Sequence, residues 1–129
     1  MKRKTYASLK RKLDVLFSRY IRRRWADKAG NVRCVSCRAV LPGEKMQAGH
    51  FVSRVHLATR WDTLNCAPQC SSCNVLRRGN LAEYAAWLQR EYGVGIIERL
   101  VQKKRERVKY TRSDLEILIA EYQGKLDSL

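Results

Sequence analysis

The sequence predicts a single α+β domain whose small core is braced by a metal ion and flanked by helices on both sides. Two observations lead to this prediction. Two Cys-x-x-Cys pairs lie 32 residues apart, and hydrophobic patterns of helical spacing precede and follow them. With 129 residues, the chain has room for one modest hydrophobic core. We therefore expect one domain over residues 1–129, with an amphipathic helix at 7–27, the braced core at 32–79 and further helices at 80–129.

The N-terminal segment has the spacing of an amphipathic helix that ends near Gly30-Asn31. Its apolar side chains recur at intervals of three or four residues, at Leu9, Leu13, Leu16, Phe17, Tyr20 and Ile21. Lys and Arg fill the remaining faces. We therefore expect the apolar stripe to face the core and the basic side chains to face solvent or a ligand.

The two cysteine pairs indicate a tetrahedral zinc site. Each pair can place two thiolates on one ion through a tight turn, and the predicted ligands are Cys34, Cys37, Cys70 and Cys73. Four thiolates leave no open position, which is typical of structural zinc. Disulfides are disfavoured in a cytoplasmic chain, and a redox Cys-x-x-Cys needs only one pair in a βαβ setting. Cys66 lies outside both pairs and is expected to be a small buried residue.

Turn signals organise the region between the two pairs. Residues 32–52 combine turns with β signals, and Pro42-Gly43 predicts a turn between two short strands. Residues 53–69 contain few periodic signals, so we expect an ordered loop there.

Capping signals place the helices that follow. A short helix after the second pair should end at Gly79, which can adopt the left-handed conformation of a helix terminator. Asn80 with Glu83 has the spacing of a capping box for the next helix, and a third, very basic helical segment follows it. Residues 111–114, Thr-Arg-Ser-Asp, are another capping signal ahead of a final apolar stripe.

Basic charge is concentrated on either side of the cysteine region. The chain carries 27 Lys and Arg against 12 Asp and Glu, a net charge of +15. The net charge is +10 over residues 1–33, +2 over 34–98 and +6 over 99–112. This distribution is suited to a polyanion that binds both basic segments and crosses the less charged region between them, so we expect a nucleic acid as the partner. A solvated surface or attraction to an anionic membrane is the alternative.

The apolar segments are too short for a membrane protein. No apolar run approaches the roughly 18–20 residues that cross a bilayer. The apolar residues near the N-terminus are interleaved with charge, whereas a secretory signal has a continuous apolar stretch. We therefore expect a cytoplasmic protein that does not enter a membrane.

A histidine and two asparagines lie in a distinctive order around the second cysteine pair. His50 ends a predicted strand, Asn65 precedes the pair and Asn74 follows its last cysteine. With the two pairs, this order resembles the HNH family, also called ββα-metal nucleases, in the version braced by a four-cysteine zinc. The resemblance implies an HNH-like ββα-metal core in which His50 is the general base, Asn65 orients it and Asn74 binds a catalytic magnesium, with manganese as an alternative. Histidine titrates near neutrality, and a hard cation neutralises charge that develops in phosphodiester hydrolysis.

One position departs from the family pattern. Many HNH nucleases carry Asp or His immediately before the base as a metal ligand, and here that position is Gly49. The missing ligand would come from Asp62 or His56 in the loop, or from His50 itself. Asp62 is equally typical of a turn, and His56 of a surface or phosphate-contacting side chain, so both interpretations stay open.

A closer resemblance extends over residues 13–84. It rests on the strings LDVLFSRYIRRRWAD, CVSC, MQAGHFVSR, TRWDTLNCAPQCSSCN and GNLAEY, which together look like the NinG/Rap proteins of lambdoid phages. That family is associated with phage recombination and with structure-selective cleavage of branched DNA such as Holliday junctions and D-loops. The resemblance therefore implies an endonuclease of branched DNA in the cytoplasm of an infected or lysogenic bacterium.

Basic side chains on these elements are the predicted DNA contacts: Arg22, Arg23, Arg24, Arg54, Arg60, Arg77, Arg78, Lys103, Lys104 and Arg105. Trp25 and Trp61 are candidates for stacking on an unpaired base, although core packing is the commoner role of tryptophan. Resolving a junction requires two cuts, which favours a homodimer; the final apolar stripe would serve pairing or core packing equally well. Two alternatives remain open, a non-catalytic zinc-ribbon DNA-binding protein and an HNH nickase of ordinary duplex DNA.

Overall fold

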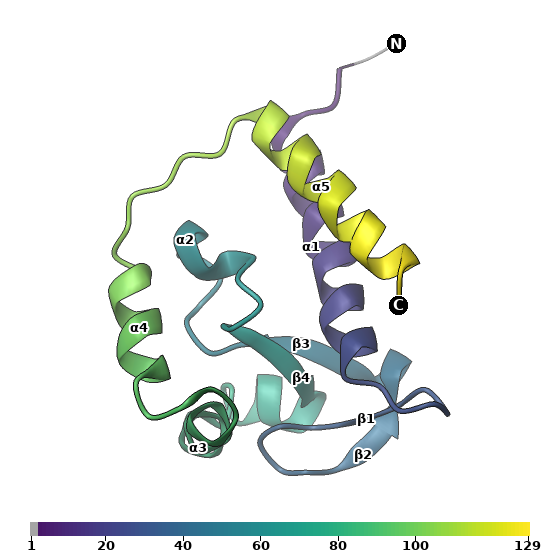
Figure 1. Ribbon diagram of the computed structural model, residues 1–129, viewed down its shortest axis with the longest axis vertical. Helices are drawn as coiled ribbons and strands as arrows, with labels where there is room; N and C mark the ends of the chain where they lie inside the picture. The colour runs from purple at the N-terminus through teal and green to yellow at the C-terminus, as the bar shows by residue number, and fades with distance from the viewer. Residues whose placement is uncertain (1–2) are drawn as a thin grey trace.

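The computed structural model describes residues 3–129, and Figure 1 shows the arrangement of its helices and strands. In chain order the elements are α1 (Tyr6–Arg24), β1 (Asn31–Arg33), β2 (Val40–Pro42), the 3-10 turn η1 (Gly43–Lys45), β3 (Met46–His50), α2 (Leu57–Arg60), β4 (Cys66–Cys70), the π-helical turn η2 (Ser72–Leu76), α3 (Leu81–Tyr92), α4 (Ile96–Lys103) and α5 (Arg112–Asp127). The structure is thus a mixed α+β one, as predicted. Residues 1 and 2 of the predicted domain lie outside the described residues.

Helix α1 forms where the N-terminal pattern predicts it, but it ends at Arg24 rather than at residue 27. The Thr5 hydroxyl caps its start by accepting a hydrogen bond from the Ser8 amide (3.1 Å). Five of the six side chains of the predicted stripe are buried, namely Leu9, Leu13, Leu16, Phe17 and Ile21, and Tyr20 is half-buried. Helix α5 packs along this stripe, and the two helices lie side by side and run in the same direction (Figure 1).

Strands β3 and β4 form an antiparallel ribbon at the centre of the structure, with His50 opposite Cys66. The prediction of a loop over residues 53–69 is therefore wrong at its end, because β4 occupies Cys66–Cys70, and it also missed the single turn of α2. Every residue of β4 is buried, so the strand shows no alternation of apolar and polar side chains. Pro68 in its middle further conceals the strand from sequence patterns.

Helices cover both faces of this ribbon. On one face, Ala48 and Cys66 pack with α1 and α5. On the other, Ala67 packs with α3 and α4, and the Tyr84 hydroxyl donates to the Gly49 carbonyl (2.7 Å). The backbone of β3, with His50 at its end, is thereby fixed between two packed layers. No helix among the described residues is long and apolar enough to cross a bilayer.

The capping signals had different outcomes. Thr111 and Asp114 form the predicted capping box at the start of α5, with reciprocal hydrogen bonds of 3.0 and 2.8 Å. Gly79 adopts the predicted left-handed conformation, with φ +93°. Asn80 also has a positive φ of 42°, and its side chain makes no cap hydrogen bond, so the predicted capping box at α3 is wrong.

Candidate metal centre and active-site pocket

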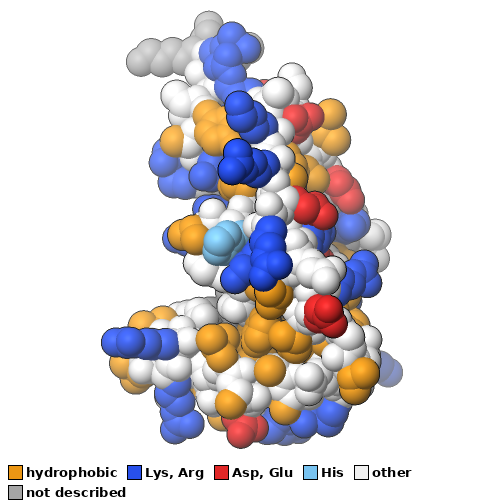
Figure 2. All heavy atoms as spheres, turned by 90° about the vertical axis from the view of Figure 1, so that its left-hand side faces the viewer, with side chains coloured by type: hydrophobic (Ala, Val, Ile, Leu, Met, Phe, Trp, Pro, Cys, Tyr) orange, Lys and Arg blue, Asp and Glu red, His pale blue; other side chains and the backbone are white. Residues whose placement is uncertain are grey.

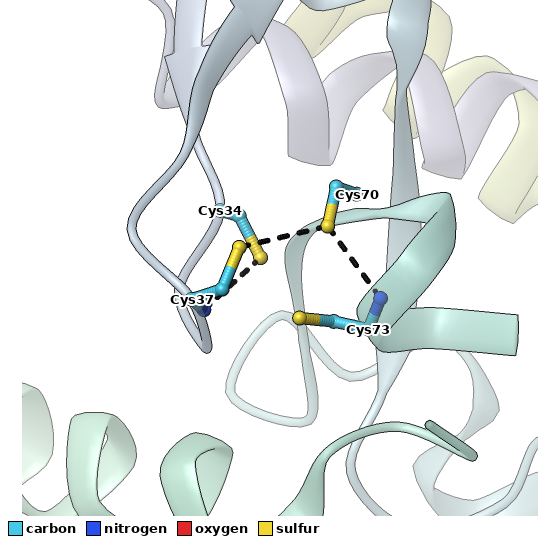
Figure 3. Close-up of side chains that lie close together, drawn as sticks. All are labelled: Cys34, Cys37, Cys70 and Cys73. Carbon is cyan, nitrogen blue, oxygen red and sulfur yellow. Dashed lines mark hydrogen bonds between the residues drawn. The ribbon is translucent and has the colours of Figure 1, made fainter. Parts of the chain in front are cut away.

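The four cysteines of the two pairs converge, as the spacing predicts (Figure 3). Cys34 and Cys37 lie in the turn between β1 and β2, whereas Cys70 ends β4 and Cys73 lies in η2. All four Sγ atoms lie within 4.8 Å of one another, and those of Cys37 and Cys70 are 3.7 Å apart. Tetrahedral zinc with bonds of about 2.3 Å sets its sulfur atoms about 3.8 Å apart. The cluster therefore fits a structural zinc ion.

Donors around the sulfur atoms favour the thiolate form that zinc requires. The amides of Cys37 and Cys73 donate to Cys34 Sγ and Cys70 Sγ, each at 3.5 Å. Asn80 Nδ2 donates to Cys73 Sγ at 3.5 Å, which explains why this side chain does not cap α3. Groups of this kind around metal ligands orient them and stabilise their charge.

Cys66 is separate from this cluster. It is 2% exposed and packs in the core between α1 and α5, as the sequence predicts. Burial raises the pKa of its thiol well above the ordinary value. Cys66 is therefore a neutral packing residue.

His50 ends β3, and its ring is held in one orientation. His50 Nε2 lies 2.8 Å from the Arg60 carbonyl oxygen. A carbonyl oxygen only accepts hydrogen bonds, so Nε2 carries a proton, and in the neutral ring Nδ1 then holds the lone pair. Burial lowers the pKa of His50, although the Arg60 carbonyl and the charge of Asp14 act in the opposite direction. The ring is consequently neutral at neutral pH.

Asn65 is fully buried and joins the two ends of the loop that follows β3. Its Oδ1 accepts from the Val52 amide (2.8 Å), and its Nδ2 donates to the carbonyl oxygens of Val52 (2.9 Å) and Thr59 (3.1 Å). The Asn65 carbonyl also accepts from the Phe51 amide (2.9 Å). The side chain thus fixes the backbone on both sides of the loop beside His50.

A pocket of about 370 Å³ opens beside His50. Side chains from α1, from β3, from the loop after β3 and from η2 line it, namely Asp14, Phe17, Ser18, Gln47, Ala48, His50, Arg54 and Asn74. Asn74 Nδ2 donates to Gln47 Oε1 (2.7 Å). The pocket thus brings together His50 and Asn74, two of the three predicted catalytic residues, while Asn65 lies behind it in the core.

The structure explains why position 49 carries glycine. A Cβ atom at Gly49 would lie 1.9 Å from Gln69 Oε1 and 2.6 Å from Gln69 Cδ. Gln69 is fully buried, and its Nε2 donates to Ser36 Oγ (2.8 Å) and to the Gly79 carbonyl (2.7 Å). The space of a side chain at position 49 is therefore filled by Gln69.

Of the predicted substitutes for the missing metal ligand, His50 lines the pocket, whereas the two loop residues Asp62 and His56 do not. Asp62 pairs with Lys103 (2.7 Å) and accepts from the Leu64 amide, and His56 precedes α2. The carboxylate that does line the pocket is Asp14, on α1. Sequence reasoning missed Asp14 because it lies 36 residues before His50, inside a helix whose many basic side chains predict contacts with nucleic acid.

The predicted DNA contacts fall into two groups. Arg23, Arg54, Arg77, Arg78 and Arg105 are exposed, whereas Arg24 and Lys104 are half-buried. Three others are engaged within the protein: Arg22 donates to the Gly43 carbonyl, Arg60 pairs with Asp14, and Lys103 pairs with Asp62. On the face shown in Figure 2, Lys and Arg side chains run down to the level of a histidine, and most Asp and Glu side chains lie to the right of this run.

Both tryptophans that were candidates for base stacking pack within the protein. Trp61 is 8% exposed, and its Nε1 donates to Asp14 (2.9 Å). Trp25 packs edge-on against Trp87, with 5.5 Å between ring centroids. The core-packing interpretation therefore holds for these two side chains.

Comparison with known proteins identifies the family. The family model for the bacteriophage lambda NinG protein matches residues 1–129. Protein ninG of Salmonella phage P22 is 30% identical over 97 residues, which cover 74% of this chain and 47% of that protein. Protein ninG of Escherichia phage lambda is 29% identical over the same length and coverage. The chain thus spans about half the length of the curated relatives it matches, and no solved structure matches it. On the match of the family model to the whole chain, the protein belongs to the NinG family.

Proposed function

We propose that this protein is an HNH-type endonuclease that hydrolyses phosphodiester bonds in DNA with His50 as the general base. One observation carries the proposal: the hydrogen bond from His50 Nε2 to the Arg60 carbonyl places the proton of the neutral ring on Nε2, so Nδ1 is the free nitrogen of a ring that lines a pocket. Arg54 and Asn74 line the same pocket, so a phosphate group there would meet a positive charge and an amide.

In the proposed reaction, a water oxygen forms a bond to phosphorus while His50 Nδ1 takes a proton from that water. The bond between phosphorus and the leaving oxygen breaks, and the leaving oxygen takes a proton from solvent. Because burial lowers the pKa of His50, the ring is neutral at neutral pH and able to accept the proton. Asn65 would orient this base by fixing the loop beside it.

A divalent cation fits the pocket at Asn74. Asn74 Nδ2 is bound to Gln47, and Asn74 Oδ1 makes no hydrogen bond to the residues that the structure describes. Magnesium, or manganese in its place, prefers oxygen ligands and retains several waters. When bound, it would neutralise charge on the phosphate and stabilise the leaving oxygen. We propose that Asn74 holds the cation, with the phosphate and water supplying the other ligands.

The proposed substrate is branched DNA, such as a Holliday junction or a D-loop formed during phage recombination. This part rests on the resemblance to the NinG/Rap proteins. The charge distribution supports a DNA partner in general, because exposed arginines stand on α1 (Arg23), on the loop after β3 (Arg54) and after η2 (Arg77, Arg78). Each of these elements also contributes to the pocket, so a DNA strand at the pocket would lie among cations.

One observation favours a second function, that of a non-catalytic zinc-ribbon DNA-binding protein. Gly49 offers no ligand, and Asp62 and His56 lie outside the pocket. The pocket therefore has fewer protein ligands for a cation than the HNH pattern carries. In that case His50 would only pack or contact phosphate.

Cleavage of a labelled four-way DNA junction, run beside a matched linear duplex with magnesium or manganese, tests the proposal. His50→Ala should lower the rate about 10²–10⁴-fold while junction binding and zinc content stay at the wild-type level. His56→Ala is the matched control and should cleave like the wild type, because His56 does not line the pocket. Binding without cleavage by the wild type would support the zinc-ribbon function instead. Equal cleavage of both substrates would indicate a nickase of ordinary duplex.

A further inference from the structure

Asp14 is the acidic side chain of the otherwise basic helix α1, and its carboxylate accepts three hydrogen bonds from the side chains of Arg60 and Trp61. Its carboxylate accepts from Arg60 Nε (3.1 Å) and Arg60 Nη2 (2.6 Å), which together form a bidentate fork. It also accepts from Trp61 Nε1 (2.9 Å). The Asp14 and Arg60 side chains are 24% and 13% exposed, so solvent screens this pair only in part.

The cluster of Asp14, Arg60 and Trp61 is connected to His50, the proposed base, through the carbonyl group of Arg60. The carbonyl of Arg60, the residue whose side chain Asp14 holds, accepts the hydrogen bond from His50 Nε2. Arg60 Nη1 also donates to the carbonyl of Arg54 (3.1 Å), a residue that lines the pocket. The Arg60 side chain thus joins α1 to both ends of the segment 54–60, since it bonds to Asp14 on α1 and to the carbonyl of Arg54.

Helix α5 holds the next peptide group of the same segment. The Tyr122 hydroxyl donates to the Trp61 carbonyl (3.2 Å), and the Tyr122 ring packs edge-on against Phe17 at 5.0 Å. Asp14 on α1 therefore holds the side chains of Arg60 and Trp61, and Tyr122 on α5 holds the Trp61 carbonyl. Together they fix the backbone at residues 60–61. The direction of the Arg60 carbonyl depends on both helices, although neither contains the base.

We propose that Asp14 is a positioning residue for DNA cleavage: through Arg60 and Trp61 it fixes the carbonyl that keeps His50 protonated at Nε2 and free at Nδ1. This inference rests on the proposed function of His50. Mutation of a group that orients a functional histidine in this way typically lowers activity by about 10–100-fold. Helix α1 thereby has a second task besides offering basic side chains to DNA.

Direct binding of the catalytic cation is the rival role for Asp14, because its side chain also lines the pocket. Both carboxylate oxygens are already in use: Oδ1 accepts from Arg60 Nε and Trp61 Nε1, and Oδ2 accepts from Arg60 Nη2. The positive charge of Arg60 also opposes that of a cation at the same carboxylate. The hydrogen bonds therefore favour positioning over metal binding.

The test compares Asp14→Asn with Glu116→Gln, which removes the same charge from an exposed site on α5. The chain has two histidines, so nitrogen-15 NMR of the zinc-loaded protein, with His56→Gln for assignment, reports the tautomer of His50. We expect the Nε2-protonated form in the wild type and in Glu116→Gln, and a mixture of tautomers in Asp14→Asn. The kcat for junction cleavage by Asp14→Asn should fall about 10–100-fold, with KM for DNA and for magnesium unchanged.

A wild-type tautomer and a wild-type kcat in Asp14→Asn would overturn the proposal. A raised KM for magnesium at unchanged kcat would also overturn it, because that result would make Asp14 a metal ligand. If Asp14→Asn does not fold, Arg60→Lys keeps the charge but loses the fork, and the same expectations and the same contrary results apply to it. If the wild type does not cleave, the proposed function fails, whereas the tautomer in Asp14→Asn still decides whether Asp14 positions His50.

Discussion

Restoring a side chain at position 49 should destabilise the protein, because Gln69 fills that space. In Gly49→Ala the new Cβ would approach Gln69 Oε1, Cδ and Cγ to between 1.9 and 2.8 Å. Moving the end of a flexible side chain is often easy, and Gln69 Oε1 itself makes no hydrogen bond within the described residues. The rest of Gln69 is less free, since its Nε2 holds Ser36 and the Gly79 carbonyl.

The expected loss follows from three contributions. Overpacking a close-packed interior costs about 1–3 kcal/mol, and two lost hydrogen bonds cost about 1 kcal/mol each. Replacing glycine by alanine lowers the entropy of the unfolded chain, which returns about 0.4–1 kcal/mol. The steric cost prevails, and Gly49→Ala should lower the free energy of unfolding by about 2–5 kcal/mol.

Urea unfolding at fixed zinc concentration, followed by circular dichroism, measures this loss. Gly124→Ala is the matched control: its Cβ meets nothing within 4 Å, and its position inside α5 should make alanine stabilising by about 1 kcal/mol. A double-mutant cycle with Gln69→Ala isolates the contact. With Gln69 truncated, the steric cost of Gly49→Ala should disappear and leave the gain of about 0.4–1 kcal/mol from the unfolded chain.

Two results would refute this reasoning. One is a Gly49→Ala protein as stable as the wild type, which would mean that Gln69 moves aside without loss. The other is an unchanged penalty for Gly49→Ala in the Gln69→Ala background, which would place the strain in the backbone rather than in this contact.

Two further predictions concern the metal centre and the pH dependence of stability. Cys37→Ser should lose bound zinc and cooperative unfolding, whereas Cys66→Ala should keep one zinc per chain. A colorimetric zinc assay and thermal melts measure both properties, and retained zinc in Cys37→Ser would contradict the four-cysteine site. Because burial lowers the pKa of folded His50, the unfolded chain binds more protons, so the free energy of unfolding should be constant above about pH 7 and fall as the pH drops through about 6.5. Urea titrations of the wild type and His50→Gln check this, and an identical pH dependence in both would exclude His50 as its source.

Features that depend on neighbours in the chain were predictable from the sequence. Cys-x-x-Cys spacing places two thiolates in one turn whatever surrounds them, and the two turns do meet. The capping box at Thr111 likewise needs only residues three positions apart. The same spacing failed at Asn80, because a sulfur atom of the four-cysteine cluster lies within reach of its side chain. Tertiary contacts there outweigh the local preference.

Features that depend on distant partners were not predictable. Strand β4 is buried on both faces, so its sequence lacks the alternation of a half-exposed strand. Arg60 reads as a free cation in the sequence, yet its partner Asp14 lies 46 residues earlier. The substitutes expected for the missing ligand at Gly49 were chosen for their closeness in sequence, whereas the carboxylate at the pocket comes from α1.

The packing at Gly49 also bears on how a catalytic cation would bind under the proposed function. With Gln69 in the place of a ligand and Asp14 bound to Arg60, the side-chain oxygens that the pocket leaves free are neutral ones, such as Asn74 Oδ1. Neutral oxygens attract a magnesium ion weakly, because such ions are ordinarily held by carboxylates, phosphates and water. Phosphate oxygens of DNA would therefore supply most of the negative charge at the site. The cation would then bind together with its substrate rather than before it, and cleavage would require the DNA to place a phosphate beside His50.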